Sequence, residues 1–185
     1  MLVSYYAISV SWCVGLVKGS EPEVPKVKAI KIDYVVGDEA LLGQIEPLWL
    51  GLNQQNVSSS LSFKPYYRAL TFEKRKTVLM QKAQAAVLRV ELAIDKSTSQ
   101  PVGYCVSSID NGRAGEVESI YVDKAFRGLS IGDALMRSAL AWLDDKGAET
   151  KLVSVAAGNE QVCRFYERYG FRIRRTVMEK TKEQY

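Results

Sequence analysis

From residue 28 onward, the hydrophobic positions of the chain alternate between a period of two and a period close to that of a helix. The first is typical of half-buried strands and the second of amphipathic helices. Period-two segments and short apolar runs predict strands at residues 28–36, 87–94, 102–109, 116–122 and 151–156. Asn111-Gly112, a pair favoured at the tip of two-residue hairpins, joins the third of these strands to the fourth. These two strands are therefore expected to be antiparallel.

Four helices are predicted between these strands. Asp38 caps the first, which bends or restarts at Pro47, and Thr71 caps the second, which runs towards Ala86. The polar, Ser-rich stretch 53–65 between them is predicted to be a loop. The apolar stripes of the four helices are, in order, Leu41, Ile45, Leu48 and Leu52; Phe72, Leu79 and Ala83; Ile131, Leu135, Ala139 and Leu143; and Val162, Phe165, Tyr166 and Tyr169.

The composition of the chain excludes several kinds of catalytic and metal site but says less about the fold class. The chain has 185 residues, of which 47% are hydrophobic and 25% charged, a balance that favours one globular domain with a sizeable core. It contains no histidine, which excludes Ser-His-Asp and Cys-His catalysis and histidine-based zinc sites. Cys13, Cys105 and Cys163 form no CxxC pair, so we expect no disulfide framework, no metal site, and a reducing, cytoplasmic location.

The net charge is only +4, too small to indicate a nucleic-acid partner. The excess of positive charge is concentrated near the end of the chain, in residues 164–185. This segment contains seven basic residues (Arg164, Arg168, Arg172, Arg174, Arg175, Lys180 and Lys182) and three acidic residues (Glu167, Glu179 and Glu183). A solvated basic tail explains this run, and attraction of an anionic ligand is the alternative. Since no continuous basic stripe exists elsewhere, nucleic-acid binding is not expected.

The first 27 residues differ from the rest and are expected to form an arm and linker before one domain at residues 28–185. Residues 1–17 carry no charge, unlike the start of a secretory signal, and their serines and tyrosines make a poor membrane span. An added strand, an arm that pairs across a homodimer and an artefact of start-site choice remain open. Two prolines in residues 20–25 (SEPEVP) predict an extended linker.

The segment after strand 116–122 carries the clearest sign of a ligand site. It reads Arg127-Gly128-Leu129-Ser130-Ile131-Gly132 and opens the third helix. A glycine-containing loop at this place offers unpaired backbone N–H groups and the positive end of a helix dipole to a diphosphate. The alternative is a plain loop before a helix capped by Ser130, because neither common phosphate-loop motif is present.

In this context the chain resembles the GNAT superfamily of acetyl-CoA-dependent N-acetyltransferases. The family pattern of Arg or Gln, two residues, Gly, one residue and Gly or Ala is matched at Arg127 and Gly132, with Ser130 where the middle Gly usually stands. A second matching stretch runs from Asn159 through Phe165-Tyr166 to Gly170-Phe171.

The resemblance covers residues 28 to about 181 and implies the fold. The expected order is strand, two helices, three antiparallel strands, helix, strand, helix and strand. This is an α/β (α+β type) architecture: a mixed, mostly antiparallel sheet flanked by helices and splayed between its fourth and fifth strands.

The resemblance also implies how the cosubstrate acetyl-CoA is held. Main-chain groups of strand 116–122 would pair with pantetheine amides, the loop would hold the diphosphate, and Asn159 would bind the pantetheine arm, cap its helix or do both. The implied cofactor-binding residues are Ile120, Tyr121, Val122, Arg127, Gly128, Leu129, Ser130, Ile131, Gly132, Asp133, Asn159 and Tyr166.

Tyr166, Glu116 and Glu118 are the catalytic candidates. The resemblance places the Tyr166 phenol opposite the thioester sulfur, where it would protonate the departing thiolate; the alternatives are a purely structural Tyr166 or Tyr169 as donor. Glu116 and Glu118 would share one face of a regular strand with Ile120 and Val122, and either could take the proton from the attacking amine. The resemblance favours Glu116 as this base, with Glu118 as the alternate. The structural alternative is a solvent-facing charged pair, or one Glu paired with a neighbouring Arg. Cys163 lacks an activating base and is not expected to form a covalent intermediate.

These observations predict an enzyme that moves an acetyl group from acetyl-CoA to a primary amine by direct attack in a ternary complex. The acceptor is open between small-molecule amines and peptide or protein amines, selected mainly by residues 41–80 and by the final strands. Aromatic and polar residues in the first of these segments could line an acceptor pocket or could equally be packing: Trp49, Asn53, Gln54, Gln55, Phe63, Tyr66 and Tyr67. The alternative is a non-catalytic module that binds CoA or acyl-CoA as a sensor or interaction domain.

Overall fold

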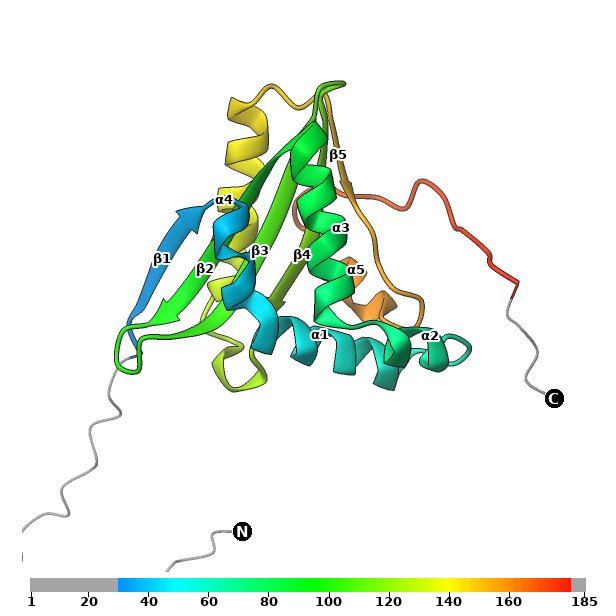
Figure 1. Ribbon diagram of the computed structural model, residues 1–185, viewed down its shortest axis with the longest axis horizontal. Helices are drawn as coiled ribbons and strands as arrows, with labels where there is room; N and C mark the ends of the chain where they lie inside the picture. Colours follow the sequence, from blue (N-terminus) through cyan, green and yellow to red (C-terminus); the bar gives the residue numbers. More distant parts are fainter. Residues whose placement is uncertain (1–29, 181–185) are drawn as a thin grey trace, which may run out of the picture.

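The computed structural model describes residues 30–180, which form a five-stranded sheet with helices on both faces (Figure 1). The strands lie in sequence order: β1 (Ile32–Gly37), β2 (Ala86–Asp95), β3 (Gln100–Asp110), β4 (Ala114–Val122) and β5 (Thr150–Val153). Neighbouring strands are antiparallel except β4 and β5, which are parallel. The predicted mixed, mostly antiparallel sheet is confirmed.

One layer of helices, between β1 and β2 in the chain, consists of η1 (Glu39–Ile45), α1 (Glu46–Ser59), α2 (Lys64–Ala69) and α3 (Phe72–Ala85). Asp38 Oδ1 accepts from the Ala40 N–H at 3.0 Å and Thr71 Oγ1 from the Lys74 N–H at 3.3 Å, as predicted for the two caps. Pro47 lies in the first turn of α1, where its missing N–H costs no helical hydrogen bond. Leu42, Ile45 and Leu79 from this layer are fully buried against β2 and β3.

The opposite face is covered by α4 (Ile131–Asp145), with η2 (Lys124–Phe126) before it and η3 (Glu160–Val162) and α5 (Cys163–Glu167) after β5. The predicted stripe of α4 is confirmed, since all four of its residues are buried. The four apolar and aromatic residues predicted for the last helix pack into the same cluster as α4. The sheet therefore separates two hydrophobic cores.

Two predicted elements are wrong. Residues 53–65 are not a loop, because α1 continues to Ser59 and α2 begins at Lys64. The polar residues are held in helix by one bond to the next helix and one within α1: Asn53 Nδ2 donates to the Tyr67 carbonyl of α2 at 2.9 Å, and Ser58 Oγ donates to the Gln54 carbonyl at 2.8 Å. Within the described residues no strand follows β5; residues 171–180 pair with no strand and leave Ile173 79% exposed.

The predicted splay between the fourth and fifth strands is confirmed. Pairing between β4 and β5 ends at Val117 and Val153, so β4 continues to Val122 without a partner on that side. The free edge of residues 118–122 opens between the two helical layers. The N-terminal arm 1–27 and Cys13 lie outside the described residues.

Neither a membrane span nor a metal site is found in the part of the chain that the structure describes. No helix in residues 30–180 is both long and apolar enough to cross a membrane. Within the same range, no three His, Cys, Asp or Glu side chains are grouped so that they could hold a metal ion.

Candidate active site

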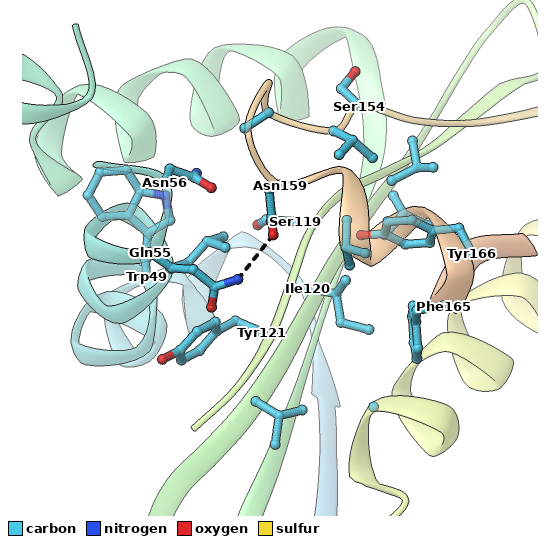
Figure 2. A pocket seen from close by; sticks show the side chains of 18 of the residues that line it. Trp49, Gln55, Asn56, Ser119, Ile120, Tyr121, Ser154, Asn159, Phe165 and Tyr166 are labelled. Atoms are coloured by element: carbon cyan, nitrogen blue, oxygen red, sulfur yellow. Dashed lines mark hydrogen bonds between the residues drawn. The ribbon is translucent and has the colours of Figure 1, made fainter. Parts of the chain in front are cut away.

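A cavity of about 1060 Å³ lies at the splay and extends to both sides of β4 (Figure 2). Its wall includes all of the predicted catalytic and cofactor-binding residues except Leu129, which is 46% exposed on the surface. Helices α1, α2 and α3 form one half of the wall; the loop 127–132, the residues after β5 and helix α5 form the other. We call these the acceptor half and the cofactor half, after the ligands that sequence analysis leads us to expect there.

A β-bulge in β4 shows that one prediction is wrong, namely that the two glutamates share a strand face with Ile120 and Val122. Val106 of β3 is opposite Ser119, whereas Ser107 is opposite Val117, so Glu118 is an extra residue in the strand. The extra residue reverses the alternation of side chains. Glu116 and Glu118 therefore face α3, while Ile120 and Val122 face α4, and the four do not share one face.

The two glutamates form a charge cluster with two cations of α3. Lys82 Nζ lies 2.7 Å from Glu116 Oε2 and also contacts Glu118 Oε1, and an Arg75 amino group lies 3.2 Å from Glu118 Oε2. Ser108 Oγ donates to Glu118 at 2.7 Å. Sequence analysis missed Arg75 and Lys82, because no local pattern connects residues 43 and 34 positions from their carboxylate partners.

These contacts distinguish the two candidate bases. Burial by itself raises the pKa of the Glu118 carboxyl, but the hydrogen bonds from Lys82 and Ser108 and the charges of Lys82 and Arg75 outweigh it and hold this pKa below its ordinary value. The Glu118 side chain is 6% exposed and that of Glu116 is 29% exposed. Glu116 is thus the more accessible of the two carboxylates.

In the cofactor half, the loop 127–132 has the backbone form expected of an anion site. Gly128 has φ +84° with open space on the side where other residues carry a side chain, and Ser130 has φ +59°, a left-handed conformation that favours glycine. Ser130 precedes α4 but its hydroxyl makes no cap bond, so the alternative of a helix capped by the Ser130 side chain is wrong. The first N–H groups of α4 therefore have no acceptor within the helix or from Ser130 Oγ.

Arg127 is held over the end of β4. Its Nε donates to the Val122 carbonyl at 3.2 Å, one Nη2 hydrogen bond of 3.0 Å goes to Gln55 Oε1, and its guanidinium lies 5.5 Å from the centre of the Tyr121 ring. Asn159, 7% exposed, receives a hydrogen bond of 3.3 Å from Gln55 Nε2 on its Oδ1 and makes no side-chain cap bond to its helix. Of its two predicted roles, the cap is wrong.

Tyr166 lies on α5 with its ring packed against Phe165 and Phe171 and its hydroxyl on the cavity wall (Figure 2). The side chain is 8% exposed, and burial raises its pKa to about 12, so the phenol stays protonated at neutral pH. Among residues 30–180 its hydroxyl has no hydrogen-bond partner. It is a protonated donor that faces the cavity.

Residues at the start of α4 and just after α5 contact one another. Tyr169 Oη donates to Asp133 Oδ1, and Arg168 Nη2 lies 3.2 Å from the same oxygen. Asp133 thus joins the start of α4 to the turn that follows α5, a contact that its predicted place in the cofactor site did not reveal. Cys163 carries a free thiol.

Comparison with known proteins gives consistent results. The model of the acetyltransferase (GNAT) family matches residues 59–171. An uncharacterised N-acetyltransferase of Methanocaldococcus jannaschii is 31% identical over 84 residues, which span 42% of this chain and only 37% of that relative.

Solved structures share the fold. A ribosomal-protein-alanine N-acetyltransferase from Brucella melitensis superposes with a TM-score of 0.58 at 15% identity, over 83% of this chain and 100% of the other. An aminoglycoside N-acetyltransferase in complex with CoA gives 0.58 at 18% identity, over 87% of this chain and 99% of the other. Two acceptor classes thus occur on equally similar folds.

Proposed function

Because the chain belongs to the acetyltransferase (GNAT) family, we propose that it transfers the acetyl group of acetyl-CoA to a primary amine by direct attack in a ternary complex. The observation that carries this proposal is Tyr166, a buried, protonated and unpartnered phenol on the wall of the cofactor half. The same fold serves a protein amine in one neighbour and an aminoglycoside in another, so the acceptor stays open.

The residues of the cofactor half fit acetyl-CoA. The unpaired edge of β4 at Ile120, Tyr121 and Val122 can bond pantetheine amides in the manner of an added strand. The open space at Gly128, the free N–H groups of α4 and the positive charge of Arg127 suit a diphosphate. When bound, acetyl-CoA would supply an activated thioester.

The residues of the chain then manage protons and charge. Glu116, directly or through water, would take a proton from the amine, because it is the more exposed of the two carboxylates. As the C–N bond forms and the C–S bond breaks, Tyr166 would donate its proton to the leaving sulfur. Lys82 and Arg75 keep Glu118 ionised, so its role would be to fix the cluster rather than to cycle a proton.

Acetyl transfer is tested with a panel of small amines, peptides and proteins by following thiol release from acetyl-CoA. Tyr166→Phe should lower kcat about 100-fold, within the usual range for loss of a general acid, with the Kd for CoA unchanged. Glu116→Gln should lower kcat with less effect on CoA binding. Tyr34→Phe, on the far edge strand β1, is the matched control and should behave as the unaltered protein. Normal turnover in both active-site variants would refute the catalytic roles.

One observation favours a second function, a CoA-binding module without catalysis. Both glutamates are already paired with Lys82, so neither is a free base. The same panel separates the functions: a module of this kind would bind CoA by calorimetry and release no thiol with any amine.

A further inference from the structure

We propose that Gln55 is a positioning residue: its side-chain amide orients Arg127 and Asn159 so that both donate hydrogen bonds to acetyl-CoA. The proposal rests on the proposed function and adds to it a residue from the acceptor half that acts on the cofactor half. Gln55 lies on α1, and its bond to Asn159 is drawn in Figure 2.

The polarity of this chain of bonds is fixed by the arginine. A guanidinium only donates, so the Gln55 atom 3.0 Å from Arg127 Nη2 must be the oxygen Oε1. The other end of the amide, Nε2, then faces Asn159 and can only donate, so it must meet Oδ1, at 3.3 Å. The remaining group of Asn159, Nδ2, is thereby turned away from Gln55 as a donor. A single residue that can only donate thus sets the orientation of two amides.

Both ends of the chain retain free donors at the cavity. Arg127 uses Nε for Val122 and one N–H of Nη2 for Gln55, which leaves three of its five N–H groups without an acceptor among residues 30–180. Asn159 Nδ2 likewise donates to no group in the described part of the chain. Three N–H groups of a cation suit a diphosphate, and an amide N–H suits a pantetheine carbonyl.

Helix α1 packs closely against the rest of the cavity wall at two points, one on each side of Gln55. A side-chain carbon added at Gly158, next to Asn159, would lie 2.2 Å from the Ser59 carbonyl at the end of α1. One added at Gly51 would lie 2.8 Å from the Tyr121 hydroxyl, and Arg127 stacks on the same tyrosine ring. Gln55 lies between these two close contacts, so its amide is held at a set distance from both partners.

The first test measures the Kd for CoA by calorimetry in Gln55→Met, which keeps the length of the side chain and removes both hydrogen bonds. Affinity should fall about tenfold, as expected for two lost contacts of which one involves a charged group. Gln54→Met is the matched control, since its side chain is exposed on the same helix, and it should bind CoA normally. Thermal unfolding of both variants should remain close to that of the unaltered protein.

The second test uses Gln55→Glu, which still accepts from Arg127 but cannot donate to Asn159. Asn159 should then turn its Nδ2 towards the new carboxylate, so CoA affinity should again fall severalfold even though the Arg127 contact is kept. In an Asn159→Ala background the same Gln55→Glu change should have little further effect, because the orientation it disturbs no longer matters. This variant also serves if Gln55→Met fails to fold.

The outcomes separate this proposal from the function on which it rests. If the unaltered protein binds no CoA, the proposed function fails and this role fails with it. If the unaltered protein binds CoA and Gln55→Met binds it as Gln54→Met does, only the role of Gln55 is refuted. An equal loss from Gln55→Glu with and without Asn159 would likewise refute it.

Discussion

The cofactor half of the cavity is formed mainly by main-chain groups, whereas the acceptor half is formed mainly by charged side chains. The cofactor half depends on the main chain: the free edge of β4, the turn at Gly128 and Ser130, and the start of α4. The acceptor half depends on charged side chains, with Glu116 and Glu118 paired to Lys82 and Arg75 of another element. A main-chain site depends on backbone angles and spacing, whereas a side-chain site depends on which partners the fold brings together. Substitutions should therefore act on backbone geometry in one half and on charge in the other.

The largest effect is expected where the two halves meet, at Gly158. Gly158→Ala should lower the free energy of unfolding by about 3 kcal/mol or more, because the residue has φ +93° and the new carbon would lie 2.2 Å from a carbonyl oxygen of α1. Urea denaturation measures the loss.

Gly128→Ala is the control for this change. It has a similar φ of +84° but open space around the added carbon, so the cost should be only the left-handed strain of about 1 kcal/mol. Equal losses from the two variants would mean that α1 does not press on Gly158 in solution.

A smaller effect, about 2 kcal/mol at pH 7, is expected for Glu118→Gln in the acceptor half. The folded pKa of Glu118 lies below its ordinary value of about 4.3, so the stabilisation is present above that pH and is lost as the pH falls through the folded pKa. The difference in unfolding free energy between the unaltered protein and the variant should therefore shrink below about pH 4.

Glu149→Gln gives the comparison for an exposed pair. Glu149 contacts Arg113 at 3.2 Å, with both side chains about two-thirds exposed, and its loss should change stability by less than about 0.5 kcal/mol. A pH-independent difference for Glu118→Gln would argue that its charge does not stabilise the cluster.

An effect smaller than that of Glu118→Gln, and of opposite sign, is expected in the cofactor half, at Ser130. Its φ of +59° and the absence of a cap bond mean that the serine has left-handed strain without a compensating contact. Ser130→Gly should therefore raise stability by about 1 kcal/mol or less, since the added freedom of glycine in the unfolded chain offsets part of the gain. A higher midpoint of thermal unfolding checks this; a lower one would show that the serine hydroxyl makes a stabilising contact.

The sequence allowed most of the fold and the cofactor half to be predicted. Hydrophobic period, caps at Asp38 and Thr71, and the Asn111-Gly112 turn each act over a few residues, so they can be recognised without tertiary information. The apolar stripe of α4 was predicted in the same way, from its hydrophobic period. The splay between the fourth and fifth strands was predicted from the family resemblance. Whether Tyr166, Glu116 and Asn159 act as proposed stays a prediction.

What could not be predicted depended on distant contacts. The helical course of residues 53–59 needed Tyr67 and the close packing of α1 on Gly158. The pairing of Arg75 and Lys82 with β4 needed α3 to lie across the sheet. Gln55 stood out only as a polar residue near a possible acceptor pocket, because its two partners are 72 and 104 positions away.

The bulge at Glu118 gives one strand two phases of alternation. Upstream of it, even-numbered positions belong to the layer that contains α3; downstream, even-numbered positions belong to the layer that contains α4. The carboxylates and the apolar side chains of this strand thus lie on opposite faces within nine consecutive residues. Sequence drift on one side of that single surplus residue can change the charged wall of the cavity while the apolar wall on the other side keeps its shape.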